Sequence, residues 1–174
     1  MSWKRVSVAL LLLAMALIAL SGFGCGGSSN GSIPSDEAML RYFEDHKAQF
    51  DALLQAVRSD PRIRYVTPSG TDKPNDVADD SGQPVGGPAA QQALALAKEL
   101  GVSNVTMSKG YFMLERVSDW PLHEGIFKGY VYSSSSPRPL VQTDTFKAYT
   151  HTNAPGPVYR TLGAGWYILC SSPG

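Results

Sequence analysis

An amphipathic stripe between residues 36 and 59 constrains the fold more than any other feature of the sequence. Apolar and aromatic side chains recur there in alternating steps of four and three: Met39, Phe43, His46, Phe50, Leu53 and Val57. This spacing predicts an α-helix of about six turns with one apolar face. Ser35 is a favourable N-cap, and Asp36 and Glu37 suit the positive end of the helix. Such a helix must cover a second layer, which the rest of the chain has to supply.

Segments with the residue types and alternation of β-strands provide that second layer. They lie at residues 62–67, 102–108, 111–117, 125–133 and 165–171, with a hairpin turn at Lys109-Gly110. A second helix is expected to begin at Pro88 and to end at Gly101. These elements predict an α+β fold, in which a largely antiparallel sheet of about five strands carries two helices on one face.

Residues 35–174 are predicted to form a single domain, because their number suffices for one hydrophobic core. Within it, residues 68–88 are rich in Pro, Gly and Asp and almost free of apolar side chains. A loop of this length is either functional or disordered, and its composition favours disorder. Leu140 and Val141 are expected to start a short strand, whereas residues 143–157 predict no regular element.

The N-terminus has the pattern of an export signal. Lys4 and Arg5 precede a run, residues 6–20, that is apolar except for Ser7. A membrane-spanning helix needs about 20 apolar residues, and this run is shorter. Small residues before Cys25 suit a signal-peptidase cleavage site. Residues 1–24 are therefore predicted to be a signal peptide.

The segment around Cys25 resembles the lipobox of bacterial lipoproteins. That resemblance implies that Cys25 becomes the mature N-terminus and carries acyl chains such as palmitate. Gly26 resembles the sorting position of lipoproteins that are directed to the outer membrane and face the periplasm. Residues 25–34 would then be the lipidated cysteine and a flexible Gly/Ser tether. The residues alone leave a second alternative, a secreted protein in which Cys25 and Cys170 form a disulfide.

Charge and motifs argue against several classes of function. With Lys4 and Arg5 removed, 13 basic residues remain against 15 acidic ones, so the net charge is −2. This balance does not suit a nucleic-acid-binding protein. The histidines, at positions 46, 123 and 151, share no metal-ligand spacing, and the acidic residues of the 68–88 loop lack the register of a calcium site. No metal or other cofactor is predicted.

No catalytic residue is predicted either. The serine run 133–136 lacks the turn that presents a hydrolase nucleophile. Cys170 shares one strand face with Trp166 and Ile168, so we expect a buried and unreactive thiol. His46 lies on the apolar stripe of the first helix and is expected to be a packing residue.

Alternation in the later strands predicts a candidate interaction face. If Phe127, Val131, Trp166 and Ile168 face the helices, the tyrosines of the same strands lie on the opposite face of the sheet. This face would hold Lys128, Tyr130, Tyr132 and Tyr167, together with Arg62 and Arg64. Tyr and Arg are enriched at the hot spots of protein interfaces. The alternative is that these tyrosines only form cross-strand pairs on a half-solvated sheet.

The sequence thus favours a membrane-anchored envelope lipoprotein that acts as a protein-binding or inhibitor/immunity-type domain, without enzymatic activity. One alternative is an envelope hydrolase whose site is assembled from Asp119, His123, Glu124 and His151. Another is a structural lipoprotein of the cell envelope. The mature domain also resembles small uncharacterised lipoproteins with a Tyr–Leu and Trp-Tyr pattern, here Tyr159, Leu162, Trp166 and Tyr167, and this resemblance implies no function.

Overall fold

The computed structural model describes residues 33–68, 76–108, 110–117, 126–152 and 156–171. The predicted signal peptide and Cys25 lie outside these residues, as does most of the predicted tether. From residue 31 onward the chain forms one unit, and only this unit is considered below. None of the helices in the described ranges combines the length and the apolar character that a membrane span requires.

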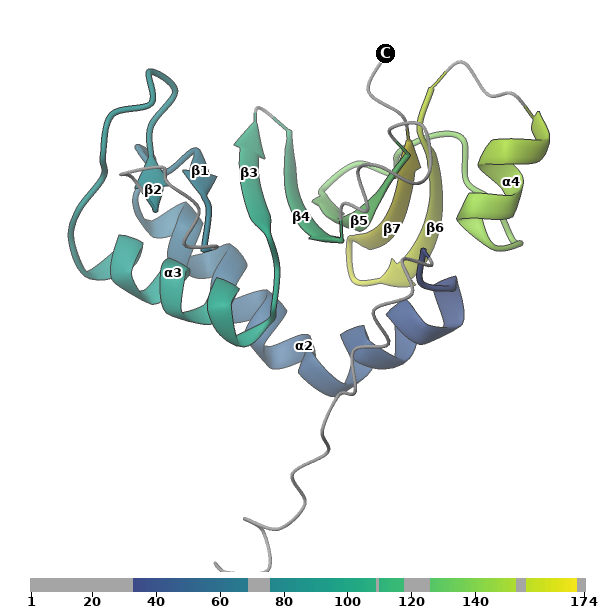
Figure 1. Cartoon of the computed structure of the whole chain (residues 1–174), viewed down its shortest axis with the longest axis horizontal. Helices are drawn as coiled ribbons and strands as arrows, with labels where there is room; N and C mark the ends of the chain where they lie inside the picture. Colours follow the sequence, from purple (N-terminus) through teal and green to yellow (C-terminus); the bar gives the residue numbers. More distant parts are fainter. Residues whose placement is uncertain (1–32, 69–75, 109, 118–125, 153–155, 172–174) are drawn as a thin grey trace, which may run out of the picture. The chain divides into compact units, whose positions relative to one another are not determined.

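The fold is α+β, as predicted (Figure 1). All strand pairs are antiparallel, and the described residues form one seven-stranded sheet with the order β2-β1-β3-β4-β5-β7-β6. Seven strands and three helices are thus described, rather than about five and two. The elements in chain order are α2 (Asp36–Ser59), β1 (Tyr65–Val66), β2 (Val77–Ala78), α3 (Pro88–Glu99), β3 (Asn104–Ser108), β4 (Tyr111–Val117), β5 (Phe127–Ser133), α4 (Thr145–Thr152), β6 (Val158–Gly163) and β7 (Trp166–Ser171).

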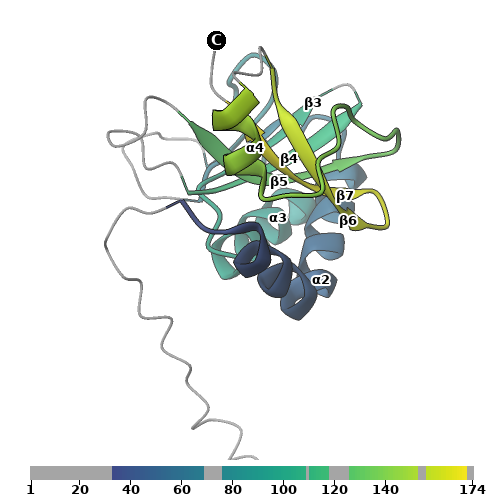
Figure 2. The same cartoon turned by 90° about the vertical axis from the view of Figure 1, so that its right-hand side faces the viewer.

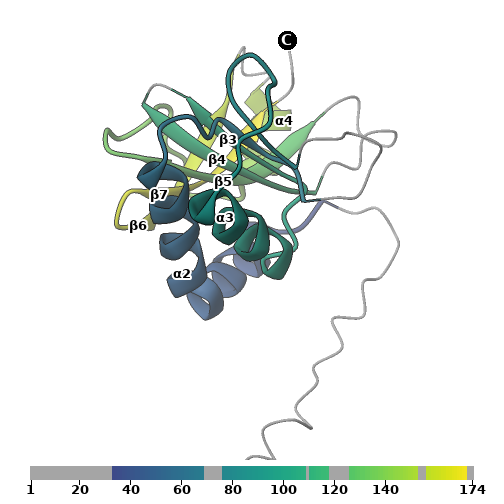
Figure 3. The same cartoon turned by 90° about the vertical axis from the view of Figure 1, so that its left-hand side faces the viewer.

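The two long helices begin and end for the reasons expected from sequence. The Ser35 Oγ accepts a hydrogen bond from the Ala38 amide at 3.3 Å and caps α2. Pro88 starts α3, and Gly101 follows it with a φ of +56°, a conformation that glycine adopts without steric cost. Both helices lie on one side of the sheet (Figures 2 and 3). The third helix, α4, contacts β6 and β7 near the sheet edge.

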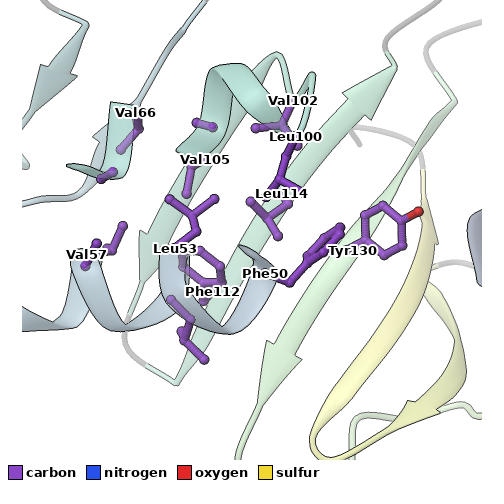
Figure 4. Packing of buried hydrophobic residues seen from close by; sticks show 14 of the residues in the cluster. Phe50, Leu53, Val57, Val66, Leu100, Val102, Val105, Phe112, Leu114 and Tyr130 are labelled. Carbon is purple, nitrogen blue, oxygen red and sulfur yellow. The ribbon is translucent and has the colours of Figure 1, made fainter. Parts of the chain in front are cut away.

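The main core lies between α2, α3 and the sheet. Figure 4 shows Phe50, Leu53 and Val57 of α2 directed toward the strands, where they meet residues such as Leu114 and Phe112. Burial of each such side chain contributes about 1.5–3 kcal/mol. The Trp166 indole Nε1 of β7 donates to Asp51 Oδ1 at 3.0 Å, so its polar atom is satisfied on the helix side as well.

Three elements were not predicted from the sequence. β2 lies inside the predicted 68–88 loop, and its Val77 pairs with Val66. Residues 76–88 thus contain a strand and the start of α3, contrary to the predicted disorder, whereas residues 69–75 lie outside the described ranges. A two-residue strand is too short to show an alternating pattern. α4 lies within residues 143–157, for which no regular element was predicted, and β6 follows directly after them. The short strand predicted to start at Leu140 and Val141 appears only as a single bridge between Leu140 and Tyr159.

Candidate functional site: a groove on the outer sheet face

Strand pairing determines which side chains share each face of the sheet. One row of paired residues lies under the helices: Val66, Val105, Leu114, Tyr130 and Ile168. The next row points to the opposite side, which we call the outer face: Tyr65, Thr106, Met113, Val131 and Tyr167. The candidate interaction residues can therefore be assigned to a face one by one.

Tyr130 and Tyr132 lie on the helix side, so their predicted place on the interaction face was wrong. Tyr130 is completely buried, its ring centroid lies 4.8 Å from that of Phe50, and its hydroxyl donates to the Met39 carbonyl at 2.9 Å. Tyr132 packs edge-on against Trp166 at 5.4 Å. The assumption that failed is that the less polar side of β5 faces the helices. A helix carbonyl satisfies the Tyr130 hydroxyl, and this ring can then be buried like that of a phenylalanine.

Phe127 and Val131 consequently lie on the outer face, which corrects the second half of the same prediction. Tyr167 lies on the outer face, where it was expected, and contributes to a small apolar cluster with Val131 and Leu169. Trp166 and Ile168 lie on the helix side, also as expected.

Lys128 is buried on the helix side and is not an interaction residue. Its Nζ lies 2.6 Å from Asp36 Oδ1 and 3.5 Å from Asp144 Oδ2, and it donates to the Pro34 carbonyl at 2.7 Å. Asp36 is itself fully buried and accepts hydrogen bonds from the amide and hydroxyl of Thr145. This group of charges joins the start of α2 to β5 and α4.

Asp144 is held in its charged form within this group. Burial raises the pKa of its carboxyl, but amide hydrogen bonds from Asp36, Lys147 and Phe146, together with the Lys128 charge, bring the pKa below its ordinary value. Arg160 from β6 adds a contact of 3.0 Å to Glu37 Oε1. The cluster fixes the point at which the chain enters the domain.

The two candidate arginines do not join Tyr167. Arg62 lies in the turn after α2, before the two-residue β1, and pairs with Asp60 at 2.6 Å. Arg64 pairs with Asp80 at 3.1 Å. Arg64 and Tyr65 both line a hollow of about 340 Å³ beside β3.

A groove with a volume of about 710 Å³ lies on the outer face of the described domain. Its apolar lining comes from β4, β5 and β7: Met113, Phe127, Val131 and Leu169. Tyr111 and Tyr159 add aromatic rings, and Ser133 and Ser135 add hydroxyls. We call this feature the outer groove.

Gly129 lies on β5 two residues before Val131, in the row of paired residues that also contains Glu115 and Leu169. It pairs with Glu115 on one side and Leu169 on the other, and contributes no side chain between them. A Cβ atom at this position would lie 2.5 Å from the Leu114 carbonyl oxygen and 3.0 Å from Cζ of Phe127. Glycine thus allows the Phe127 ring to lie close against the strand, as interior strand glycines often do.

Glu115 is the charged residue among the described residues that line the outer groove. Its side chain is half-buried, and its carboxylate has no hydrogen-bond or ion-pair partner within the described part of the chain. Tyr159 is also partly buried; burial, and to a lesser extent the nearby Tyr111 hydroxyl, raises the pKa of the Tyr159 phenol. The Tyr159 phenol is therefore neutral near pH 7.

The remaining sequence candidates occupy ordinary structural positions. His46 stacks on Tyr42, with ring centroids 4.1 Å apart, as expected for a packing residue. Cys170 is buried, and burial raises the pKa of its thiol to about 12. Asp79 Oδ1 accepts bonds from the amides of Ser81 and Gln83, so this acid stabilises a turn.

The described residues contain no group of His, Cys, Asp and Glu that could hold a metal ion. His151 is exposed on α4, whereas Asp119, His123 and Glu124 lie outside the described ranges. Comparisons with family models, with curated proteins and with solved structures find no match to this chain.

Proposed function

We propose that this chain is a membrane-anchored binding domain of the cell envelope, and that it holds a protein partner in the outer groove. The supporting observation is the apolar floor of this groove, formed by the partly buried Met113 and the buried Val131 and Leu169, with no residue of a described helix in its lining. Concave surfaces with apolar floors and exposed tyrosines at their rims are typical of binding sites. Tyr111 supplies such a rim residue, with 43% of its surface exposed.

The same proposal includes the lipid anchor at Cys25 on the periplasmic side of the outer membrane. The contact between Lys128 and Pro34 fits this arrangement, because it fastens the domain at the point where the predicted tether ends. The buried position of Cys170 fits it too, because a disulfide to Cys25 would require the core to open around that sulfur.

For the anchor, we predict that the intact mass of the mature protein from membranes equals residues 25–174 plus the acyl chains on Cys25. The Cys25→Ser variant should lose this added mass and leave the membrane fraction, because two or more acyl chains are needed for durable anchoring. A wild-type product that is freely dissolved and contains a Cys25–Cys170 disulfide would contradict the prediction.

For the binding surface, we predict that Tyr111→Ala reduces partner capture from envelope extracts about tenfold or more, as expected for loss of a hot-spot residue. Leu140→Ala is the matched control, because Leu140 is equally exposed, at 45%, but does not line the outer groove. The measurement is quantitative mass spectrometry of cross-linked complexes. Equal recovery from both variants would rule out the groove as the contact surface.

A further inference from the structure

The outer groove adjoins the smaller hollow beside β3. Tyr111 lines both hollows, and the smaller one extends past β3 to Tyr65 on β1, which is 41% exposed. Tyr65, Thr106 and Met113 are successive members of the outer row, so no change of sheet face separates the two hollows. Binding sites for small molecules are typically single hollows of several hundred cubic ångströms. A surface that spans strands β1 to β6 instead fits an extended segment of a protein.

The charges along this surface favour a cation. Glu115 has no described partner, whereas the charge of Arg64 in the smaller hollow is offset by Asp80. No described Lys, Arg or His lines the outer groove. The electron-rich rings of Tyr111 and Tyr159 add a second attraction for ammonium and guanidinium groups. Complementary charge of this kind determines which partner binds more than how tightly it binds.

We infer that the segment of the partner that enters the outer groove is extended and combines an apolar side chain with a Lys or Arg, whose charge lies near Glu115. This inference rests on the proposed function of the groove as a protein-binding surface. It adds the chemistry of the partner: apolar contact with Met113, Val131 and Leu169, and a cation at the Glu115 end of the same groove.

Three acetylated and amidated octapeptides test the charge. They share one Leu/Ser sequence and differ only in a central Lys, Gln or Glu; each extends up to about 26 Å, enough to reach both hollows. Binding to the full chain is followed by NMR through the methyl group of Met113, and the buried Met39 methyl serves as the internal control. We expect the Lys peptide to bind about fivefold more tightly than the Gln peptide, the upper range for one exposed charge pair.

Charge reversal provides the decisive comparison. Glu115→Gln should remove the preference for the Lys peptide, and Glu115→Lys should transfer the preference to the Glu peptide. Tyr65→Ala should weaken all three peptides, because an extended segment also covers the smaller hollow. Equal affinity of the three peptides for the wild type, or an unchanged order in Glu115→Lys, would overturn the inference.

Two further outcomes separate this inference from the proposed function. If octyltrimethylammonium shifts the Met113 methyl signal while no peptide does, the groove takes a small cationic amphiphile and the inference is overturned. If Tyr111→Ala abolishes partner capture while the peptides show no charge preference, the inference also fails, but the proposed binding surface stands. Conversely, a charge preference that reverses in Glu115→Lys supports the inference independently of any captured protein.

Discussion

Lys128→Met is expected to lower the free energy of unfolding by about 3–5 kcal/mol, the usual cost of removing one partner from a buried ion pair. The variant keeps the apolar length of the side chain but removes the ammonium group that lies 2.6 Å from Asp36 Oδ1. Asp36 is fully buried, so water cannot replace that partner without opening the cluster. The Pro34 carbonyl also loses its donor.

Urea denaturation of the two proteins measures this difference. Lys98→Met on α3 is the matched control, because Lys98 is exposed and the same chemical change there should alter stability by less than about 0.5 kcal/mol. A Lys128→Met protein within about 1 kcal/mol of the wild type would show that the Asp36 carboxylate does not depend on this cation.

The same variant should change the response to acid. Because the pKa of Asp144 is lower in the folded chain than its ordinary value, its contribution to stability is complete above the unfolded pKa of about 3.9 and is lost as the pH falls through the folded value. The Lys128 charge is one cause of that lowered pKa. Lys128→Met should therefore lose less additional stability than the wild type when the pH falls below about 4.

Local signals in the sequence were sufficient for the longest elements. The apolar stripe and Ser35 predicted α2 correctly, and Pro88 and Gly101 gave the bounds of α3 to within two residues. Period-two alternation located β4 and β7 in the same way. β1 is shorter than its predicted strand because Arg62 turns back to pair with Asp60 instead of entering the sheet.

Contacts between distant parts of the chain determine α4 and β6, the two elements after β5 that local sequence patterns did not predict. α4 begins where Asp144 accepts amide hydrogen bonds from Phe146 and Lys147, and Thr145 binds Asp36, more than a hundred residues away. No local periodicity reports such a contact. β6 is likewise defined by its pairing with β7, around a tight turn in which Ala164 has a φ of +52°.

The sequence predicted a Tyr-containing outer face of the sheet, but of the three tyrosines assigned to it only Tyr167 lies there. A Tyr-containing outer face exists, yet its exposed members are Tyr65 and Tyr111, whereas Tyr130 and Tyr132 belong to the core. Alternation separates the two faces of a strand without saying which one the helices cover. The sequence did contain one indication of the correct assignment, which is Gly129. A glycine inside a central strand often marks a place where another group approaches the backbone closely.

The face assignment itself predicts a large effect for Tyr130→Ala. Its ring fills the core beside Phe43 and Phe50, so truncation should cost about 3–5 kcal/mol of unfolding free energy, as for other buried aromatic residues. Tyr130→Phe should cost only about 1 kcal/mol, because it removes the hydrogen bond to the Met39 carbonyl and keeps the packing. Thermal or urea denaturation followed by circular dichroism distinguishes the two values.

This prediction also separates a core tyrosine from a binding tyrosine. Tyr111→Ala removes a ring that is 43% exposed, so it should leave the unfolding free energy within about 1 kcal/mol of the wild type and reduce partner capture. Tyr130→Ala should reduce capture only to the extent that the chain unfolds, and Tyr130→Phe should capture normally. A Tyr130→Ala protein that keeps wild-type stability but loses its partner would mean that β5 presents the opposite face to the helices, and the outer groove would then not exist as described.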